Sequence, residues 1–194
     1  EFLYCLLTNI REISSQTKTK TFDELFMSEL SVTSLNDPTK KLPNERSLIF
    51  PLDCTEGPVA DKLKKYLTSD GLVKKFVQFP KILFIQVNGS YRNFDQEIDL
   101  ADQSTNQVQL PHSAYTLCGF IIRCGYSRLE GHYKVVVRSN HPEVWHYSSD
   151  MIRGYYTTFD YEDDIQTQLN CLSSNSPVPE NIRLLMYVSN DSIK

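Results

Sequence analysis

The spacing of apolar residues predicts helices mainly in the first part of the chain. Over residues 2–13, apolar side chains recur at helical spacing, which predicts an amphipathic helix. Residues 21–26 are predicted to form a short helix. Residues 59–67 are predicted to form a longer one, with apolar residues on one face and lysines on the other. A further helix is predicted over residues 160–169.

Runs of apolar and β-branched residues, separated by short turns, predict a series of strands in the remainder of the chain. Residues 115–124 are almost wholly apolar, so this strand is expected in the centre of its sheet. The sequences Asn36-Asp37-Pro38 and Pro43-Asn44 predict a polar connection. This arrangement is typical of an α+β domain with an antiparallel sheet. The predicted strands cover residues 47–52, 79–87, 115–124, 131–139, 144–148 and 182–188.

The composition is typical of a single globular domain over residues 1–194, with 40% hydrophobic and 23% charged residues. No apolar run reaches the ~20 residues needed to span a bilayer, so no membrane anchor is expected. A net charge of -4 argues against nucleic acid as the main partner, because phosphate binding needs a clustered basic face. Residues 62–65 with Lys74 and Lys75 form a small basic cluster, which is interpreted as a solvated helix face.

The cysteines indicate a reducing environment and no metal site. There are five of them, an odd number at irregular spacings, and no pair has the C-x2-C spacing of a zinc site. An intracellular protein, cytoplasmic or nuclear, is therefore expected, without a cofactor. The cysteines are Cys5, Cys54, Cys118, Cys124 and Cys171.

Five segments of the chain follow one another in an order that resembles the ubiquitin-specific proteases, a papain-like family of cysteine proteases. A proline leads into the first apolar strand, a tyrosine begins the second, and a Gly-His-Tyr sequence comes next. A tryptophan-led strand and a closing apolar strand follow. These segments are residues 79–87, 115–125, 131–133, 145–150 and 184–188.

The resemblance implies a papain-like ubiquitin-specific protease fold, with a central antiparallel sheet called the palm and helices around it. Residues 79–188 correspond to the palm with the histidine segment. Residues 14–46 correspond to the region called the fingers, which is reduced here and contains no cysteine to bind zinc. The chain is expected to be truncated at the N-terminal thumb of the fold.

The resemblance also assigns roles to five residues. His132 corresponds to the catalytic imidazole, which activates a thiol as an ion pair. Ser149 or Asp150 would hold that imidazole in the right orientation. Gly131 and Tyr133 are expected to line the cleft for the ubiquitin tail, where a glycine allows close passage of the backbone.

Two departures from the family pattern affect the expected activity. The segment that carries the nucleophilic cysteine is absent from all 194 residues, and Cys5 lies inside an apolar helical pattern where core packing is its expected role. That segment also supplies oxyanion-hole donors, so this chain alone is expected to be inactive. Ser149 carries no charge and would stabilise an imidazolium less than a carboxylate does, and Asp150 could compensate or simply cap a turn.

Two functional hypotheses follow. The first is a piece of a deubiquitinating cysteine protease whose nucleophile lies outside this chain, since the chain starts at Glu1 within an apolar helical pattern. Its substrate would be ubiquitin joined through its C-terminal carboxyl to an amine. The second is a catalytically inactive scaffold that binds ubiquitin or a partner protein. A related modifier in place of ubiquitin, and a purely structural domain, also stay open.

Overall fold

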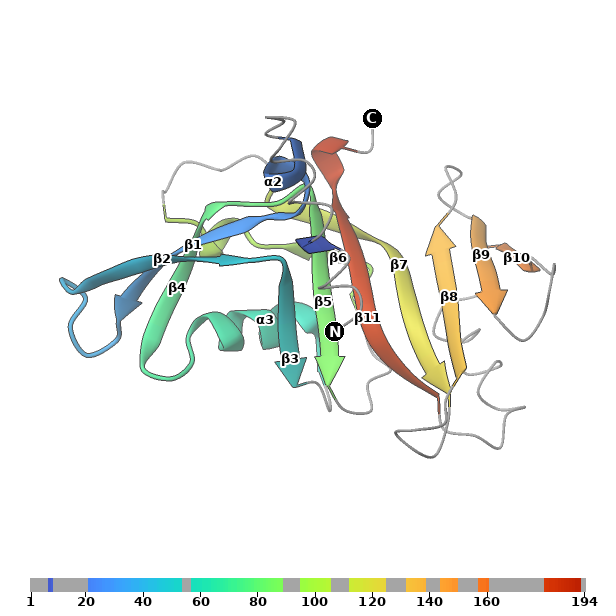
Figure 1. Ribbon diagram of the computed structural model, residues 1–194, viewed down its shortest axis with the longest axis horizontal. Helices are drawn as coiled ribbons and strands as arrows, with labels where there is room; N and C mark the ends of the chain where they lie inside the picture. The colour runs from blue at the N-terminus through green and yellow to red at the C-terminus, as the bar shows by residue number, and fades with distance from the viewer. Residues whose placement is uncertain are drawn as a thin grey trace.

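The computed structural model contains a large sheet and a smaller one, joined through a helix and a shared core (Figure 1). The seven strands of its main path run in the order β10-β9-β8-β7-β11-β5-β3, and β6 pairs with β7. The structure describes residues 7–8, 21–53, 57–88, 95–105, 112–124, 132–138, 144–149, 157–160 and 180–192. The large sheet contains β3 (Ile49–Asp53), β5 (Ile82–Asn88), β6 (Glu97–Asp99), β7 (Ala114–Cys124), β8 (His132–Arg138), β9 (Val144–Ser149), β10 (Thr157–Asp160) and β11 (Glu180–Ser189).

The centre of the large sheet is formed by β7 and β11, the two longest described strands. The predicted central position of residues 115–124 is confirmed, because β7 pairs with β11 on one side and with β8 on the other. These pairings are antiparallel, as predicted, but β3 runs parallel to β5. The prediction of a wholly antiparallel sheet is therefore wrong at this edge. The chain between β3 and β5 includes a helix, and a connection of that length allows a parallel pair.

The smaller sheet has the order β2-β1-β4 and lies to the left in Figure 1. The predicted polar connection is correct at the turn around Asp37, but Pro43 and Asn44 lie within a strand. This strand is at the edge of its sheet and largely exposed, where a proline is tolerated. The three strands are β1 (Ser28–Ser34), β2 (Lys41–Ser47) and β4 (Leu72–Gln78).

The helices α2 (Thr21–Phe26) and α3 (Val59–Leu67) have the bounds expected from the sequence. Val59, Leu63 and Leu67 of α3 are completely buried, in agreement with the predicted apolar face. Helix α3 packs against β3 and β4 and therefore connects the two sheets. The two described 3-10 helices are η1 (Ala101–Gln103) and η2 (Asn190–Ser192).

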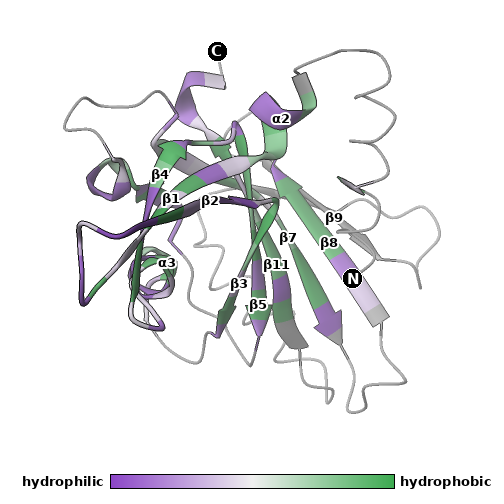
Figure 2. Ribbon diagram, turned by 60° about the vertical axis from the view of Figure 1, so that its left-hand side comes forward, coloured by the Kyte–Doolittle hydropathy of each residue, from purple (hydrophilic) through white to green (hydrophobic). Residues whose placement is uncertain are grey.

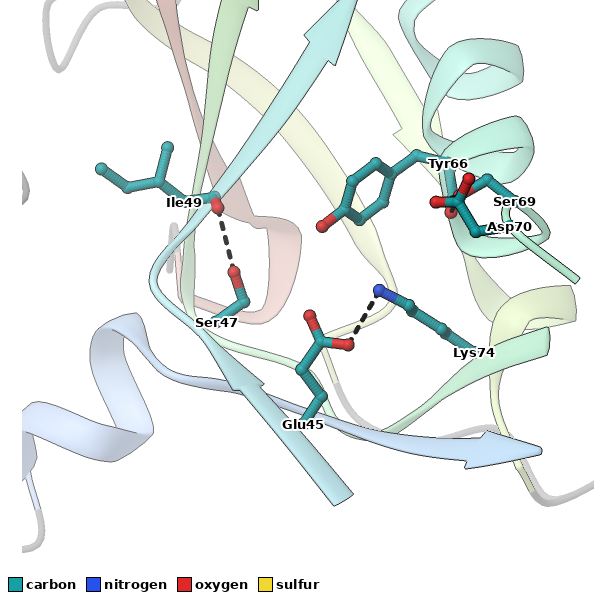
Figure 3. A network of polar contacts seen from close by, with 7 residues as sticks. All are labelled: Glu45, Ser47, Ile49, Tyr66, Ser69, Asp70 and Lys74. Carbon is teal, nitrogen blue, oxygen red and sulfur yellow. Dashed lines mark hydrogen bonds and ion pairs between the residues drawn. The ribbon is translucent and has the colours of Figure 1, made fainter. Parts of the chain in front are cut away.

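Lys74 and Lys75 lie on β4, so their assignment to a solvated helix face was wrong. Lys74 extends from β4 into a polar network between the small sheet and α3 (Figure 3). Its Nζ lies 2.8 Å from Glu45 Oε2 and 5.0 Å from the centroid of the Tyr66 ring. The side chain of Lys74 is only 12% exposed, so its charge is balanced by a carboxylate and an aromatic face within a partly dry environment.

The first core lies between α3, the small sheet and one face of the large sheet. Phe76 of β4 is at its centre, with its ring stacked on Phe79 at 4.4 Å and tilted against Phe50 at 5.8 Å. Tyr115 is fully buried, and its hydroxyl donates a hydrogen bond of 2.7 Å to the carbonyl oxygen of Pro80. These contacts fix β7 and the start of β5 against the small sheet.

A second core covers the opposite face of the large sheet. Leu7, Phe22 and Met27 pack there with Phe84 of β5, and Met186 of β11 lies at the margin of this cluster. Alternate residues of a strand point to opposite faces, so β5 and β11 contribute to both cores. In Figure 2 both strands have green, apolar segments, which are interrupted by hydrophilic ones.

Two helix predictions fall largely outside the described residues. Residues 7 and 8 are helical, and the remainder of the predicted helix 2–13 is not described. Asp160 ends β10, a strand that the sequence did not predict, so the predicted helix cannot begin there. Residues 161–169 lie outside the described part. Within the described residues, no helix is both long and apolar enough to cross a membrane.

Candidate functional site

The candidate catalytic histidine lies at one end of the large sheet. His132 is the first residue of β8 and pairs with Cys124, the last residue of β7. Strand β11 begins at this end of the sheet, the lower one in Figure 1, and β9 runs toward it and ends opposite Lys134. The ends of several strands therefore lie at this end of the sheet.

Ser149 is placed on the strand next to His132. It is the last residue of β9 and pairs with Lys134, two residues after His132 on β8. Positions two apart on a strand share a face, and directly paired positions on neighbouring strands do so as well. Positions 132 and 149 are thus diagonal neighbours on one face of the sheet.

Of the two residues expected to line the tail cleft, the structure describes Tyr133. It is 51% exposed and pairs with Arg123 of β7. Successive residues of a strand point to opposite faces, so Tyr133 is exposed on the face opposite to position 132. Gly131 and Asp150 lie outside the described residues, so their predicted roles stay predictions.

A comparison with protein families now identifies the chain. The family described as ubiquitin carboxyl-terminal hydrolase matches residues 1–166. The chain belongs to this family. No curated protein gives a significant match. Family membership implies a deubiquitinating hydrolase function, with ubiquitin or ubiquitin-conjugated proteins as partners.

Cys124 lies near the candidate site, and nothing in the sequence pattern singles it out. Cys124 is directly opposite His132 in the antiparallel pairing of β7 and β8. An experiment that locates the nucleophile with a thiol-specific reagent must therefore distinguish Cys124 from a cysteine elsewhere, because both could react.

Cys118 is unsuited to the role of the nucleophilic cysteine that a hydrolase of this family requires. It lies in the interior of β7, several residues before the end of the sheet that contains His132. Burial raises the pKa of its thiol, and the positive charge of Arg138 opposes this only in part. Since the thiolate is the reactive form, a raised pKa lowers reactivity at neutral pH.

We expect Cys118 to be alkylated slowly in the folded protein at neutral pH. Its rate with iodoacetamide should be about ten-fold or more below that of the same cysteine in the denatured chain, because both thiolate fraction and access are reduced. The rate should increase as the pH rises toward the raised pKa. Peptide mass spectrometry after timed labelling measures this. Equal rates in the folded and denatured chain would contradict the assignment.

His112 is a structural histidine. Its Nδ1 lies 3.0 Å from Ser189 Oγ, and its backbone N–H donates to Asp191 Oδ2 at 3.0 Å. These contacts connect the turn before β7 with the end of β11, far from His132 along both strands. His112 itself lies in the turn before β7. Among the described residues, no group of three or more possible ligands could hold a metal ion.

Proposed function

We propose that this chain is the palm part of a deubiquitinating cysteine protease whose nucleophilic cysteine lies on sequence outside it. His132 acts as general base and then general acid, and Ser149 or Asp150 orients its imidazole. The observation that carries this proposal is the position of His132 at the start of β8, with Ser149 as its diagonal neighbour on β9. Membership of the ubiquitin hydrolase family supplies the substrate class.

The chemistry follows from these roles. The imidazole of His132 accepts the thiol proton, and the resulting thiolate attacks the carbonyl carbon at the C-terminus of ubiquitin. The imidazolium then protonates the departing amine as the bond to it breaks, leaving a thioester. Water, activated by the same imidazole, hydrolyses the thioester and releases the ubiquitin carboxylate. The donors that stabilise the oxyanion belong to the segment with the nucleophile.

The test uses the natural polypeptide that contains this chain and a ubiquitin with a thiol-reactive C-terminus. We expect a covalent adduct, with the modified cysteine outside the 194 residues. A Cys124→Ser variant should react at the same rate, because Cys124 is not the nucleophile. Mass spectrometry of the digested adduct locates the modified residue. An adduct at Cys124 would contradict the proposal, and so would the absence of any adduct.

The uncharged Ser149 supports a second candidate function, that of an inactive ubiquitin-binding scaffold. A serine hydroxyl can accept a hydrogen bond from imidazole but stabilises an imidazolium less than a carboxylate does. The scaffold would bind unmodified ubiquitin yet form no adduct with the reactive form. Binding measured by calorimetry, alongside the adduct assay on the same polypeptide, separates the two functions.

A further inference from the structure

Two residues with reactive side chains are placed directly opposite each other in the large sheet. Cys124, the last residue of β7, pairs with His132, the first residue of β8. The pairing of the two strands runs through six consecutive residue pairs without a register shift. Directly paired positions on antiparallel strands share one face of the sheet. Positions 124 and 132 therefore lie on the same face.

This face is the one that the first core covers farther along the two strands. Ile122, two residues before Cys124, is 2% exposed, and Val136, four residues after His132, is 4% exposed. Both belong to the first core. Positions two or four apart on a strand lie on one face, so positions 124 and 132 continue this row to the ends of their strands.

A third position on this face carries a positive charge. Lys134 follows His132 by two residues and pairs with Ile122, and its side chain is half-buried. It is therefore a diagonal neighbour of Cys124. Imidazole and ammonium groups near a cysteine favour the thiolate, which is the reactive form of the side chain. This placement distinguishes Cys124 from Cys118, whose pKa is raised by burial.

The proposed function requires a second thiol at the same histidine. The nucleophilic cysteine has to come within hydrogen-bond distance of the imidazole of His132, because that imidazole takes its proton. Two cysteines can form a disulfide when their Cα atoms are within about 7 Å of each other. The register of β7 and β8 thus supplies a cysteine at the position where a bond to the nucleophile could form.

We propose that Cys124 is a resolving cysteine, which forms a reversible disulfide with the nucleophilic cysteine in the presence of hydrogen peroxide. This inference rests on the proposed function, which places the nucleophile outside the chain. The nucleophilic thiolate attacks one peroxide oxygen, the O–O bond breaks, and the hydroxide that leaves is protonated to water. The nucleophile is then a sulfenic acid.

The second step forms the disulfide. The thiolate of Cys124 attacks the sulfur of the sulfenic acid, the S–O bond breaks, and the hydroxide that leaves is again protonated to water. The two thiols are oxidised by two electrons in total, and hydrogen peroxide is reduced to water. While the S–S bond exists, the nucleophile cannot attack ubiquitin. Thiols reduce the disulfide and restore the nucleophile.

The role of Cys124 is to keep this loss of activity reversible. A sulfenic acid that meets no thiol is oxidised further to a sulfinic acid, which thiol reductants do not reverse. Formation of the disulfide prevents that second oxidation. A protein without Cys124 should therefore lose its activity permanently under conditions from which the wild type recovers.

The experiment exposes the reduced natural polypeptide to hydrogen peroxide and measures its rate with a fluorogenic ubiquitin amide, before and after dithiothreitol. The wild-type rate should fall by about ten-fold or more and return to at least about half of its starting value. Cys124→Ser should also lose its rate but regain less than about a tenth of it. Mass spectrometry of a non-reducing digest should find, in the oxidised wild type, Cys124 joined to a cysteine outside the 194 residues.

The matched control is Cys118→Ala, which removes the other described cysteine of β7. It should recover as the wild type does. Three results would overturn the inference: equal recovery of the wild type and Cys124→Ser, loss of activity without a disulfide at Cys124, and a disulfide that joins Cys124 to another of the 194 residues. Equal starting rates of the reduced wild type and reduced Cys124→Ser show that the variant is folded.

The starting rate also separates this inference from the proposed function. A reduced wild type that cleaves the ubiquitin amide but forms no disulfide at Cys124 would leave the proposed function correct and the resolving role wrong. A reduced wild type that shows no cleavage would contradict the proposed function, and the resolving role with it.

Discussion

Replacing His132 by alanine should lower kcat/KM for cleavage of a ubiquitin amide by about 10³- to 10⁴-fold, because one residue serves as both base and acid. The natural polypeptide that contains this chain is the material to assay. Binding of unmodified ubiquitin should change little, since the imidazole acts mainly in the transition state. Steady-state kinetics with a fluorogenic ubiquitin amide measures the first quantity, and calorimetry the second.

The pH profile distinguishes a catalytic histidine from a structural one. The wild-type rate should change across about pH 6–8, where imidazoles titrate, and the variant should lose that change. His112→Asn is the matched control: it removes a histidine far from the site, and asparagine tolerates the positive φ of 69° at this position. Its rate should stay within about three-fold of wild type. A His132→Ala rate equally close to wild type would oppose the assigned role.

Replacing Phe76 by alanine should reduce the free energy of unfolding by about 3–5 kcal/mol, because a large aromatic side chain leaves a cavity in the first core. Phe76 is completely buried and stacks on Phe79 at 4.4 Å. It also meets Phe50 of the large sheet, so its loss weakens the contact between the two sheets. Unfolding in urea, followed by far-ultraviolet circular dichroism, gives the free energy.

The neighbouring residue provides the control for this prediction. Val77 lies on the same strand but points the other way and is 39% exposed. Val77→Ala should change the free energy of unfolding by less than about 1 kcal/mol, as substitutions on an exposed surface usually do. Similar losses in both variants would show that strand propensity, and not burial against Phe79, determines the stability of β4.

How far the sequence predicts the fold depends on how strongly each element is patterned. Helix α3 was predicted with its observed bounds, because Val59, Leu63 and Leu67 repeat at helical spacing beside lysines. Strand β4 was missed, since Lys74 and Lys75 interrupt its alternation. The structure explains the first of these lysines: Lys74 is held by Glu45 and the ring of Tyr66, so a charged residue occupies a largely covered position.

The candidate site was predictable in part. Its histidine was expected at the start of a strand, and the structure places His132 there. The pairing of Cys124 with His132 was not predictable, because it depends on the register of β7 and β8 across the connection between them. A shift of one residue would place a different residue opposite the imidazole and reverse the face of every side chain on the strand. Local sequence does not determine that register.

The position of β11 has a consequence for the order of folding. This strand comes last of all the described strands, yet it lies between β5 and β7 and pairs with both. The two halves of the large sheet therefore have no shared strand until residues 180–189 have left the ribosome. Contacts between such distant parts of a chain form slowly. During synthesis, the exposed edges of β5 and β7 would need protection from other chains, for example by a chaperone.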